Sequence, residues 1–592
     1  MDRDLESIQE VRRLVDKAAQ AARTLATFSQ SQTDSVVAAM AEAARRHAEP
    51  LARLAVEETT YGVVGDKIEK NLFSARDVYH AIKDLKTAGI IREDPKDGIV
   101  EIAVPVGVVA AIIPCTNPTS TAIFKALIAL KGRNAIVMSP HPSAVRCIAE
   151  TCRILEEAAR QVGAPEGSIG CMTLVTSQAT EELMRHPKTA IILATGGAGL
   201  VRAAYSSGKP ALGVGPGNVP AYIHRSAHLA KAVADILRGK CFDNGTICSS
   251  EQHMVVDQEV AEAVRAEAER QGGFFLSPEQ SQAVARVLIL PNFRVNPKMV
   301  GQSAETIARA AGFSIPNGTR ALIAPLEGIG RDHPLSAEKL SPVLSFCVVK
   351  DWHEGLEICR RLLEFGGLGH TMAIHAQDQQ VVRAMALELP AFRLVVNTPA
   401  PHGSIGYSTK LFPSMSLGCG SPGGNITSDN LSPWHLINIK RLAWERRAVT
   451  GVPATGTSDS SMPESPAYRT PSFSLPAAGL GQPPSPSKDL PADREQISQL
   501  VERFLSARHS RATSADVPAK ATAPTSEPAS SAEVAEASSA HPATPPRAVD
   551  FVCEEDVRRA LRHGEKIYIT SRTLVTPAAR DLGEANEVFV TI

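Results

Sequence analysis

Cys248 has the surroundings of a thiol that takes part in chemistry. It lies in the stretch Phe-Asp-Asn-Gly-Thr-Ile-Cys-Ser-Ser-Glu-Gln at 242–252, among small and polar residues rather than in an apolar run. A nucleophilic cysteine needs access and a nearby positive potential, because the thiolate is the reactive form. We expect a helix beginning near Ile247, with Asn244 or Thr246 as its N-cap, to supply that potential through backbone N–H groups. The commoner alternative is a buried structural thiol, and this stretch alone leaves both open.

The composition excludes several classes of protein. The chain has 592 residues, and 62 Lys and Arg balance 63 Asp and Glu, so no strong charge favours a nucleic acid or a membrane surface as partner. Its ten cysteines form no CxxC pair, which fits a reducing compartment and free thiols. The first residues form no apolar signal segment, and no apolar run is long enough to span a bilayer. We therefore expect a soluble cytoplasmic protein of several domains, with no metal site.

Apolar strands alternate with helices along the first three quarters of the chain. Residues 1–80 have apolar positions at helical spacing, and buried strands are predicted at 106–114, 134–138 and 189–194, with helices between them. Continuous apolar strands that alternate with helices predict a parallel sheet covered on both faces. Mixed strands and helices return over 254–400, so the fold class is α/β.

Glycine-rich turns follow or precede several of these predicted strands. Thr195, Gly196, Gly197 and Gly199 stand between the strand at 189–194 and a helix. Glycines at such a place let the backbone approach a phosphate or a nicotinamide, but they also form ordinary turns. Further clusters occur at 213–220 and at 366–372, and the latter contains His370.

The composition changes at about Gly451. Residues 451–550 contain 15 of the chain's 41 prolines together with dense Ser, Ala and Thr, which predicts a disordered linker. Within it, 493–508 has five apolar residues at helical spacing: Ile497, Leu500, Val501, Phe504 and Leu505. An isolated amphipathic helix of this length needs a surface to fold on, either a partner or the rest of its own protein. Residues 551–592 follow as a small module with a predicted helix and two predicted strands.

Several motifs occur in an order that resembles the aldehyde dehydrogenase superfamily, and its CoA-acylating branch in particular. They are Gly-Val-Val-Ala-Ala-Ile-Ile-Pro-Cys-Thr-Asn-Pro at 107–118, the stretches 213–220 and 242–252, Gly-His-Thr at 369–371 and Ser-Leu-Gly-Cys-Gly at 416–420. The branch includes one half of bifunctional aldehyde–alcohol dehydrogenases and enzymes of bacterial microcompartments. The resemblance implies a doubly wound cofactor domain over 1–216, an α/β catalytic domain over 217–400, and a return of 401–450 as loops and oligomerisation segment. It also implies a homo-oligomer.

The resemblance implies a role for each motif. Cys248 would attack the aldehyde carbonyl, and the oxyanion would take hydrogen bonds from the Cys248 N–H and the Asn117 side chain, with Thr116 as a rival. Hydride transfer to NAD would leave an acyl–cysteine thioester. His370 would assist proton transfer or serve only as a structural residue. The residues expected to bind the cofactor are Pro114, Thr195, Gly196, Gly197, Gly199, Gly215 and Glu338, the last through a ribose, although its motif Glu-Lys-Leu-Ser-Pro is degenerate.

Two departures from the hydrolytic relatives are informative. Those relatives have a glutamate in a Glu-Leu-Gly-Gly motif that activates water, and Val214 stands at that position when the chain is aligned on Pro220. Valine cannot act as a base, whereas the thiol of CoA is a far better nucleophile than neutral water. Ser139 stands where a lysine usually contacts the adenosine ribose, which leaves NADP open, and the branch favours NAD. Cys419 also lies in a glycine-rich loop but matches no nucleophile motif.

These observations predict a CoA-acylating aldehyde dehydrogenase. It would convert a short-chain aldehyde, CoA and NAD into acyl-CoA and NADH, inside a bacterial microcompartment of the cytoplasm. Residues 493–508 resemble an encapsulation peptide that docks on a shell protein, although such peptides usually lie at a terminus. The alternatives are a hydrolytic aldehyde or semialdehyde dehydrogenase of the same fold, or an inactive scaffold.

Overall fold

The structure is a computed structural model. It describes residues 3–291 and 293–447 and, near the C-terminus, 549, 551–570, 573–576, 579–580, 582–583, 586 and 588–591. The predicted linker at 451–550, apart from Val549, and the predicted helix at 493–508 lie outside the described residues. The chain divides into two compact units, Met1–Thr457 and Ser458–Ile592.

The N-terminal residues form helices, as their periodicity predicts. These are α1 (Arg3–Leu25), α2 (Gln30–Arg46), α3 (Ala48–Thr59), α4 (Val64–Leu72), the π-helical turn η1 (Phe73–Val78) and α5 (Tyr79–Ile82). Helix α2 begins with a capping box in which Ser29 Oγ accepts from the Gln32 N–H at 3.2 Å and Gln32 Oε1 accepts from the Ser29 N–H at 2.9 Å. Helix α4 differs from the others because the residues it buries are polar: Lys67, Lys70 and Asn71.

A five-stranded parallel sheet follows, in the strand order β5-β4-β3-β6-β7. Its strands are β3 (Val108–Ile113), β4 (Ala135–Pro140), β5 (Ile169–Cys171), β6 (Thr189–Thr195) and β7 (Ala211–Val214). Its helices are α6 (Pro118–Lys131), α7 (Val145–Gln161), α8 (Ser177–Arg185) and α9 (Ala198–Tyr205), and α6 is buried at every position. The strand order reverses between β3 and β6, which is the doubly wound arrangement that binds dinucleotides.

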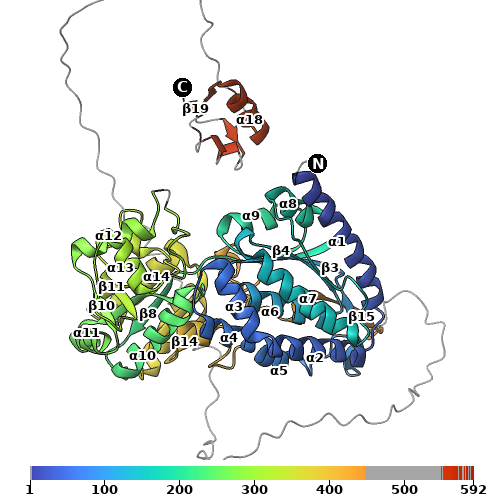
Figure 1. The fold of residues 1–592 in the computed structure, drawn as a ribbon, viewed down its shortest axis with the longest axis horizontal. Helices are drawn as coiled ribbons and strands as arrows, with labels where there is room; N and C mark the ends of the chain where they lie inside the picture. Colours follow the sequence, from blue (N-terminus) through green and yellow to red (C-terminus); the bar gives the residue numbers. More distant parts are fainter. Residues whose placement is uncertain are drawn as a thin grey trace, which may run out of the picture. The chain divides into compact units, whose positions relative to one another are not determined.

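A seven-stranded parallel sheet has the order β10-β11-β12-β9-β8-β13-β14. Its strands are β8 (Val219–Ile223), β9 (Glu251–Asp257), β10 (Gly273–Phe275), β11 (Ala321–Pro325), β12 (Val343–Val349), β13 (Gly369–His375) and β14 (Ala391–Val396). The helices of this part are α10 (Leu229–Cys241), α11 (Ala261–Arg270), α12 (Pro278–Leu288), α13 (Ala304–Ala310), α14 (Trp352–Gly366), α15 (Gln379–Glu388) and α16 (Ala400–Ser404). Figure 1 shows the two sheets in opposite halves of this unit, with α3 and α4 near the middle. The predicted α/β class is therefore confirmed.

Short 3-10 turns and a small antiparallel sheet complete the unit. The turns are η2 (Pro142–Ala144), η3 (Phe242–Gly245), η4 (Gln258–Val260), η5 (Pro334–Ser336), η6 (Ser421–Gly423) and η7 (Pro433–Leu436). The small sheet joins β1 (Gly89–Asp94), β2 (Ile99–Pro105) and β15 (Ile437–Ala443) in the order β1-β2-β15. The stretch 401–450 was expected to form loops, and β15 is a strand within it because it pairs with β2 along its whole length. The domain boundaries at 216 and 400 stay predictions.

The C-terminal unit has a small core of its own. Its described elements are β16 (Phe551–Val552), α18 (Glu554–His563), β17 (Ile567–Ile569), β18 (Leu574–Val575) and β19 (Phe589–Thr591). Strand β16 pairs with β18 and β17 pairs with β19, both in parallel. Val552, Val557, Ala560, Ala579 and Val588 form the buried cluster between them.

Candidate active site

A cavity of about 990 Å³ opens where the strands of the five-stranded sheet end. Its walls include Pro114 after β3, Pro140 at the end of β4, Thr195 at the end of β6 and Val214 at the end of β7, and the stretch 246–248 closes it on another side. Open α/β sheets bind ligands at the carboxyl ends of their strands, at the point where the strand order reverses. The cavity lies at that point, between β3 and β6.

Most of the residues predicted for the site line this cavity. They are Pro114, Asn117, Thr195, Gly196, Gly197, Gly215, Cys248 and Glu338. His370 contacts Cys248 from the neighbouring sheet. Gly199 is not among the lining residues and is exposed in the first turn of α9.

The helix expected to begin near Ile247 does not form. Residues 246–250 are turns and bends that lead directly into β9. Before them, Asp243, Asn244 and Gly245 have φ values of 49°, 52° and 74°, and three left-handed residues in succession end a right-handed helix. Neither Asn244 nor Thr246 therefore caps a helix beside the thiol.

The group next to the thiol is the imidazole of His370, not the N-terminus of a helix. Its Nε2 lies 3.3 Å from Cys248 Sγ, and its Nδ1 lies 2.9 Å from the Thr371 hydroxyl. The sequence places His370 in a glycine-rich turn, but the structure has it fully buried on strand β13. Gly217 packs against both residues, because a Cβ there would lie 2.1 Å from the Cys248 carbonyl oxygen and 3.3 Å from His370 Cγ.

Burial determines the charge of this pair. It raises the pKa of Cys248 to about 12, with further increases from Glu338 and Cys419, while the Arg393 guanidinium opposes the shift. It also lowers the pKa of His370 to about 3, and Arg393 lowers it further. Near neutral pH the pair is therefore a neutral thiol and a neutral imidazole, not a thiolate beside an imidazolium.

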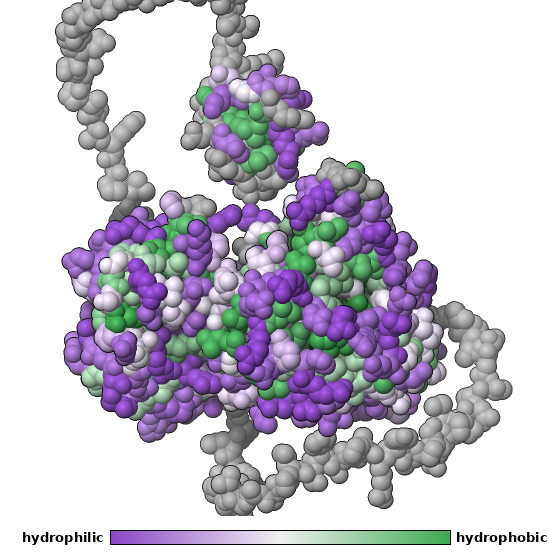
Figure 2. All heavy atoms as spheres, viewed as in Figure 1, coloured by the Kyte–Doolittle hydropathy of each residue, from purple (hydrophilic) through white to green (hydrophobic). Residues whose placement is uncertain are grey.

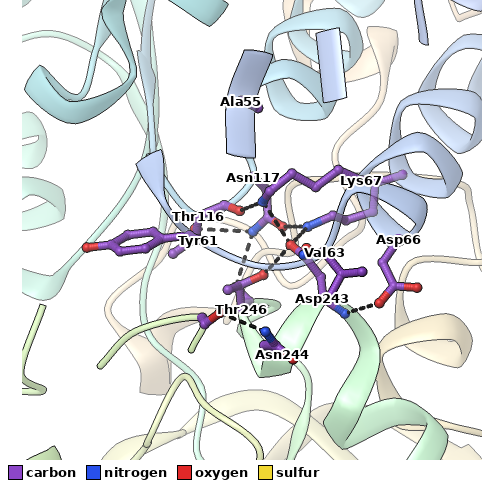
Figure 3. A network of polar contacts seen from close by, with 12 residues as sticks. Ala55, Tyr61, Val63, Asp66, Lys67, Thr116, Asn117, Asp243, Asn244 and Thr246 are labelled. Atoms are coloured by element: carbon purple, nitrogen blue, oxygen red, sulfur yellow. Dashed lines mark hydrogen bonds and ion pairs between the residues drawn. The ribbon is translucent and has the colours of Figure 1, made fainter. Parts of the chain in front are cut away.

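Asn117 precedes α6 and faces a polar network that the sequence analysis missed (Figure 3). Its Oδ1 accepts from Lys70 Nζ at 2.6 Å, and its Nδ2 donates to the Thr246 carbonyl at 3.3 Å and to Thr116 Oγ1 at 3.2 Å. Lys70 and Lys67 both contact the carboxylate of Asp243. Lysines on a helix normally face solvent, so no signal in the sequence indicates their burial.

Glu338 places a carboxyl group in the cavity. Its Oε1 accepts from the Gly217 N–H at 3.3 Å, and burial raises its pKa to about 7. Val214 is buried at the end of β7 and lines the same cavity. The position of the hydrolytic glutamate is thus apolar, although an acid stands elsewhere on the wall.

Comparisons with known proteins decide the family. A model of the aldehyde dehydrogenase family matches residues 5–271. The crystal structure of an acetylating aldehyde dehydrogenase from Geobacillus thermoglucosidasius is 54% identical in sequence, covers 76% of this chain and 99% of its own, and has a TM-score of 0.75. This chain belongs to the aldehyde dehydrogenase family. The family and the fold predicted from the motifs are therefore confirmed.

Two further relatives of this aldehyde dehydrogenase differ in how much of their own length the match covers. The bifunctional aldehyde-alcohol dehydrogenase AdhE of Escherichia coli is 45% identical over 442 residues, which are 74% of this chain and 50% of the relative, so the chain spans about half of that relative's length. A propionaldehyde dehydrogenase from the Clostridium phytofermentans fucose utilisation bacterial microcompartment is 28% identical. Its structure covers 74% of this chain and 97% of its own, with a TM-score of 0.67.

The described part of this aldehyde dehydrogenase contains no helix that is both long and apolar enough to cross a membrane. Hydrophilic residues cover most of the face of the larger unit that Figure 2 shows. Within the same described ranges, no group of three or more His, Cys, Asp and Glu side chains is arranged to hold a metal ion.

The state of the thiol in this aldehyde dehydrogenase is open to direct measurement. With the pKa of Cys248 near 12, the thiolate fraction at pH 7 is only about 10⁻⁵. We expect the rate at which iodoacetamide alkylates Cys248 to rise about tenfold for each pH unit between pH 6 and 9. Peptide mass spectrometry would follow the site, with Cys347, which is half-buried like Cys248, as an internal reference. A rate that is already level at pH 7 would contradict a neutral thiol.

Proposed function

We propose that this chain is an NAD-dependent, CoA-acylating aldehyde dehydrogenase that converts short-chain aldehydes into acyl-CoA through a thioester on Cys248. The observation that carries the proposal is the Cys248–His370 contact at 3.3 Å, beside a cavity in which Val214 replaces the acid of hydrolytic enzymes. The 54% identity with an enzyme described as acetylating supports it.

Neutral His370 is suited to remove the proton of Cys248 during attack. With its Nδ1 paired to Thr371, its Nε2 faces the thiol and can accept the proton as the carbon–sulfur bond forms. A general base is needed here because burial keeps the thiol protonated at neutral pH. Once that proton has left to solvent, the same nitrogen can accept the proton of the incoming CoA thiol and return it to Cys248 Sγ as the acyl–cysteine bond breaks and the acyl–CoA bond forms.

Asn117 is suited to stabilise the oxyanion that attack produces. Its amide nitrogen makes only long hydrogen bonds, of 3.2 and 3.3 Å, so the substrate oxygen can compete for its hydrogens. The Cys248 N–H is the second proposed donor. Removal of one such donor typically costs about 10²–10³ in kcat.

The cavity fits a dinucleotide. Its volume of about 990 Å³ lies at the upper end of the range for small-molecule sites, and it follows the strand ends of a doubly wound sheet. Apart from adjacent residues, no protein heavy atom lies within 4 Å of a Cβ placed on Gly197 or on Gly215, so both glycines leave space in the cavity. Thr195, Gly196, Gly197, Gly215 and Glu338 would hold NAD, which supplies a hydride acceptor when bound.

The dependence on CoA tests the proposal. When the enzyme is mixed with acetaldehyde or propionaldehyde and NAD but no CoA, we expect about one NADH per chain, because the thioester stays on Cys248. Steady turnover should begin after CoA is added. Cys248→Ala should lower the rate about 10³-fold or more, whereas Cys115→Ala, a thiol in the same cavity, serves as the matched control. Absorbance of NADH follows the reaction. An equal steady rate with and without CoA would show that acyl transfer to CoA is not the reaction.

Hydrolysis is the second candidate, and Glu338 is the observation that favours it. A carboxyl group with a pKa of about 7 in the cavity could activate water, with a rate that rises as the pH rises through 7. In that case Glu338 would be the base that activates water, a role that Val214 cannot fill.

Substitution of Glu338 separates the two candidates. If Glu338 binds a ribose, Glu338→Gln should raise the KM for NAD several-fold, and neither protein should release free carboxylic acid when CoA is absent. Glu181→Gln, at another acid of the cavity wall, is the control. Carboxylic acid formed by the wild type and lost in Glu338→Gln, measured by chromatography, would establish hydrolysis instead.

We propose further that residues 493–508 direct the enzyme to a microcompartment shell. The support is the helical spacing of the apolar residues in this stretch of the sequence, and the 28% identical relative from a microcompartment. The homo-oligomer implied by the family is likewise a proposal. Exposed Ile439, Leu442 and Trp444, in and after β15, give a second copy an apolar surface to cover.

A fusion tests the targeting proposal. Residues 485–512 fused to a fluorescent protein should co-purify with shells made in the same cells. A fusion with Leu500→Glu and Phe504→Glu should not, because both changes place charge on the apolar face. Fluorescence in purified shells is the measurement, and equal recovery of the two fusions would refute a role for that face.

A further inference from the structure

Two lysines of α4 are buried behind the Asn117 amide. Lys67 and Lys70 stand three residues apart, so they share one face of the helix, and each side chain is only 2% exposed. Both contact the carboxylate of Asp243, which is fully buried, with Lys67 Nζ at 2.9 Å from its Oδ2 (Figure 3). Buried lysines are uncommon, and their cost demands a partner for each ammonium group.

Asp243 alone does not satisfy both cations. Its Oδ2 accepts from both lysines and from Thr246 Oγ1 at 2.6 Å, and its Oδ1 accepts from the Val63 N–H at 2.7 Å. The remaining lysine hydrogens therefore need other acceptors. Lys67 donates to the Thr116 carbonyl at 3.1 Å, and Lys70 donates to Asn117 Oδ1 at 2.6 Å.

The bond to Lys70 decides which way the Asn117 amide faces. An ammonium group has three donors and no acceptor, so only the oxygen end of the amide can face it. A flipped amide would set its NH₂ group against the cation. The nitrogen therefore faces the Thr246 carbonyl, two residues before Cys248, and both Thr246 and Cys248 line the cavity.

We propose that Lys70 is a positioning residue that holds the Asn117 amide with its nitrogen toward the oxyanion, and that Asp243 holds Lys70 in place. The proposal rests on the proposed function, in which Asn117 donates to the oxyanion. Its physical basis is the difference between the hydrogen bonds at the two ends of the amide. The oxygen has a short, charge-assisted bond to Lys70, whereas the nitrogen has two long, weak bonds. Rotation of a free amide would instead present its oxygen to the developing negative charge.

The protonation of Lys70 adds a signature that a purely structural residue would lack. Burial, with Lys67 beside it, lowers the pKa of Lys70 to about 8, while Asp243 and Asp66 oppose the shift. These are the charged groups that face it, Lys67 and Asp66 from its own helix and Asp243 from η3. The charged form is the one that orients the amide, so its effect is present below pH 8 and lost as the pH rises through 8.

The burst of NADH without CoA tests the proposal, because it reports the steps on Cys248 alone. We expect Lys70→Met to slow the burst about tenfold or more. Lys67→Met is the matched control, since Lys67 has the same helix, burial and carboxylate partner but bonds to Thr116 and not to the amide; its burst should stay within about threefold of wild type. The burst amplitude counts competent chains, so the rate is compared among folded molecules only.

A double-mutant cycle tests the route through Asn117. If Lys70 acts through the amide, Lys70→Met should add no further loss to Asn117→Ala. Losses that multiply, or a normal burst in Lys70→Met, would overturn the proposal. Lys70→Arg keeps its charge at all these pH values, so it should restore part of the rate and remove the decline near pH 8. A decline that persists unchanged in Lys70→Arg would also overturn it.

Further controls separate this proposal from the proposed function. A burst that survives in Cys248→Ala would reject the thioester route itself. A burst lost in Cys248→Ala but normal in Asn117→Ala would leave the nucleophile in place and reject the role of Asn117, and that of Lys70 with it.

Discussion

The loop that carries Cys248, the proposed nucleophile, depends on a buried carboxylate, because Asp243 joins this loop to the N-terminal helices. Two lysines from α4 and the Thr246 hydroxyl converge on its oxygens, and its backbone N–H donates to Asp66 at 2.7 Å. The backbone there is left-handed, a conformation that non-glycine residues avoid unless the surroundings compensate. Gly62 leaves room for the carboxylate, because a Cβ there would lie 2.0 Å from its Oδ1. This arrangement leads the chain to Cys248 without a helix.

The chemistry of the pair follows from its burial. A low-dielectric setting disfavours both the thiolate and the imidazolium, so it moves the pKa values of Cys248 and His370 apart, to about 12 and about 3. Such a pair cannot rest as an ion pair at neutral pH. In the proposed reaction, attack by Cys248 is therefore coupled to proton transfer to His370. Arg393, bonded to the carbonyls of Gly369 and Gly418, is a buried cation that lowers the pKa of both groups.

In the proposed reaction, whether water or CoA attacks the thioester depends on where acidic side chains lie in the cavity. Val214 removes the carboxylate that hydrolytic relatives use, which was visible in the sequence. Glu338 brings a carboxyl group with a pKa near 7 into the same cavity, which the sequence assigned to the cofactor alone. Its bond to the Gly217 N–H keeps it close to the backbone that borders Cys248. The absence of an acid at Val214 is therefore a weaker argument against hydrolysis than the positions of all acidic side chains on the cavity wall.

Residue types and their spacing were enough to predict the parallel sheets, the glycine-rich strand ends and the family, because apolar periodicity and short motifs are local properties of the chain. Most of the residues it selected do line one cavity. It was wrong about the helix at Ile247 and about the turn at His370, since side chains distant in sequence decide both conformations. It could not identify Lys67 and Lys70, which look like solvent-facing residues of an amphipathic helix. Their burial became apparent only in the folded protein, because the groups that accept their hydrogen bonds, the Asp243 carboxylate, the Thr116 carbonyl and the Asn117 amide, are remote from them in sequence.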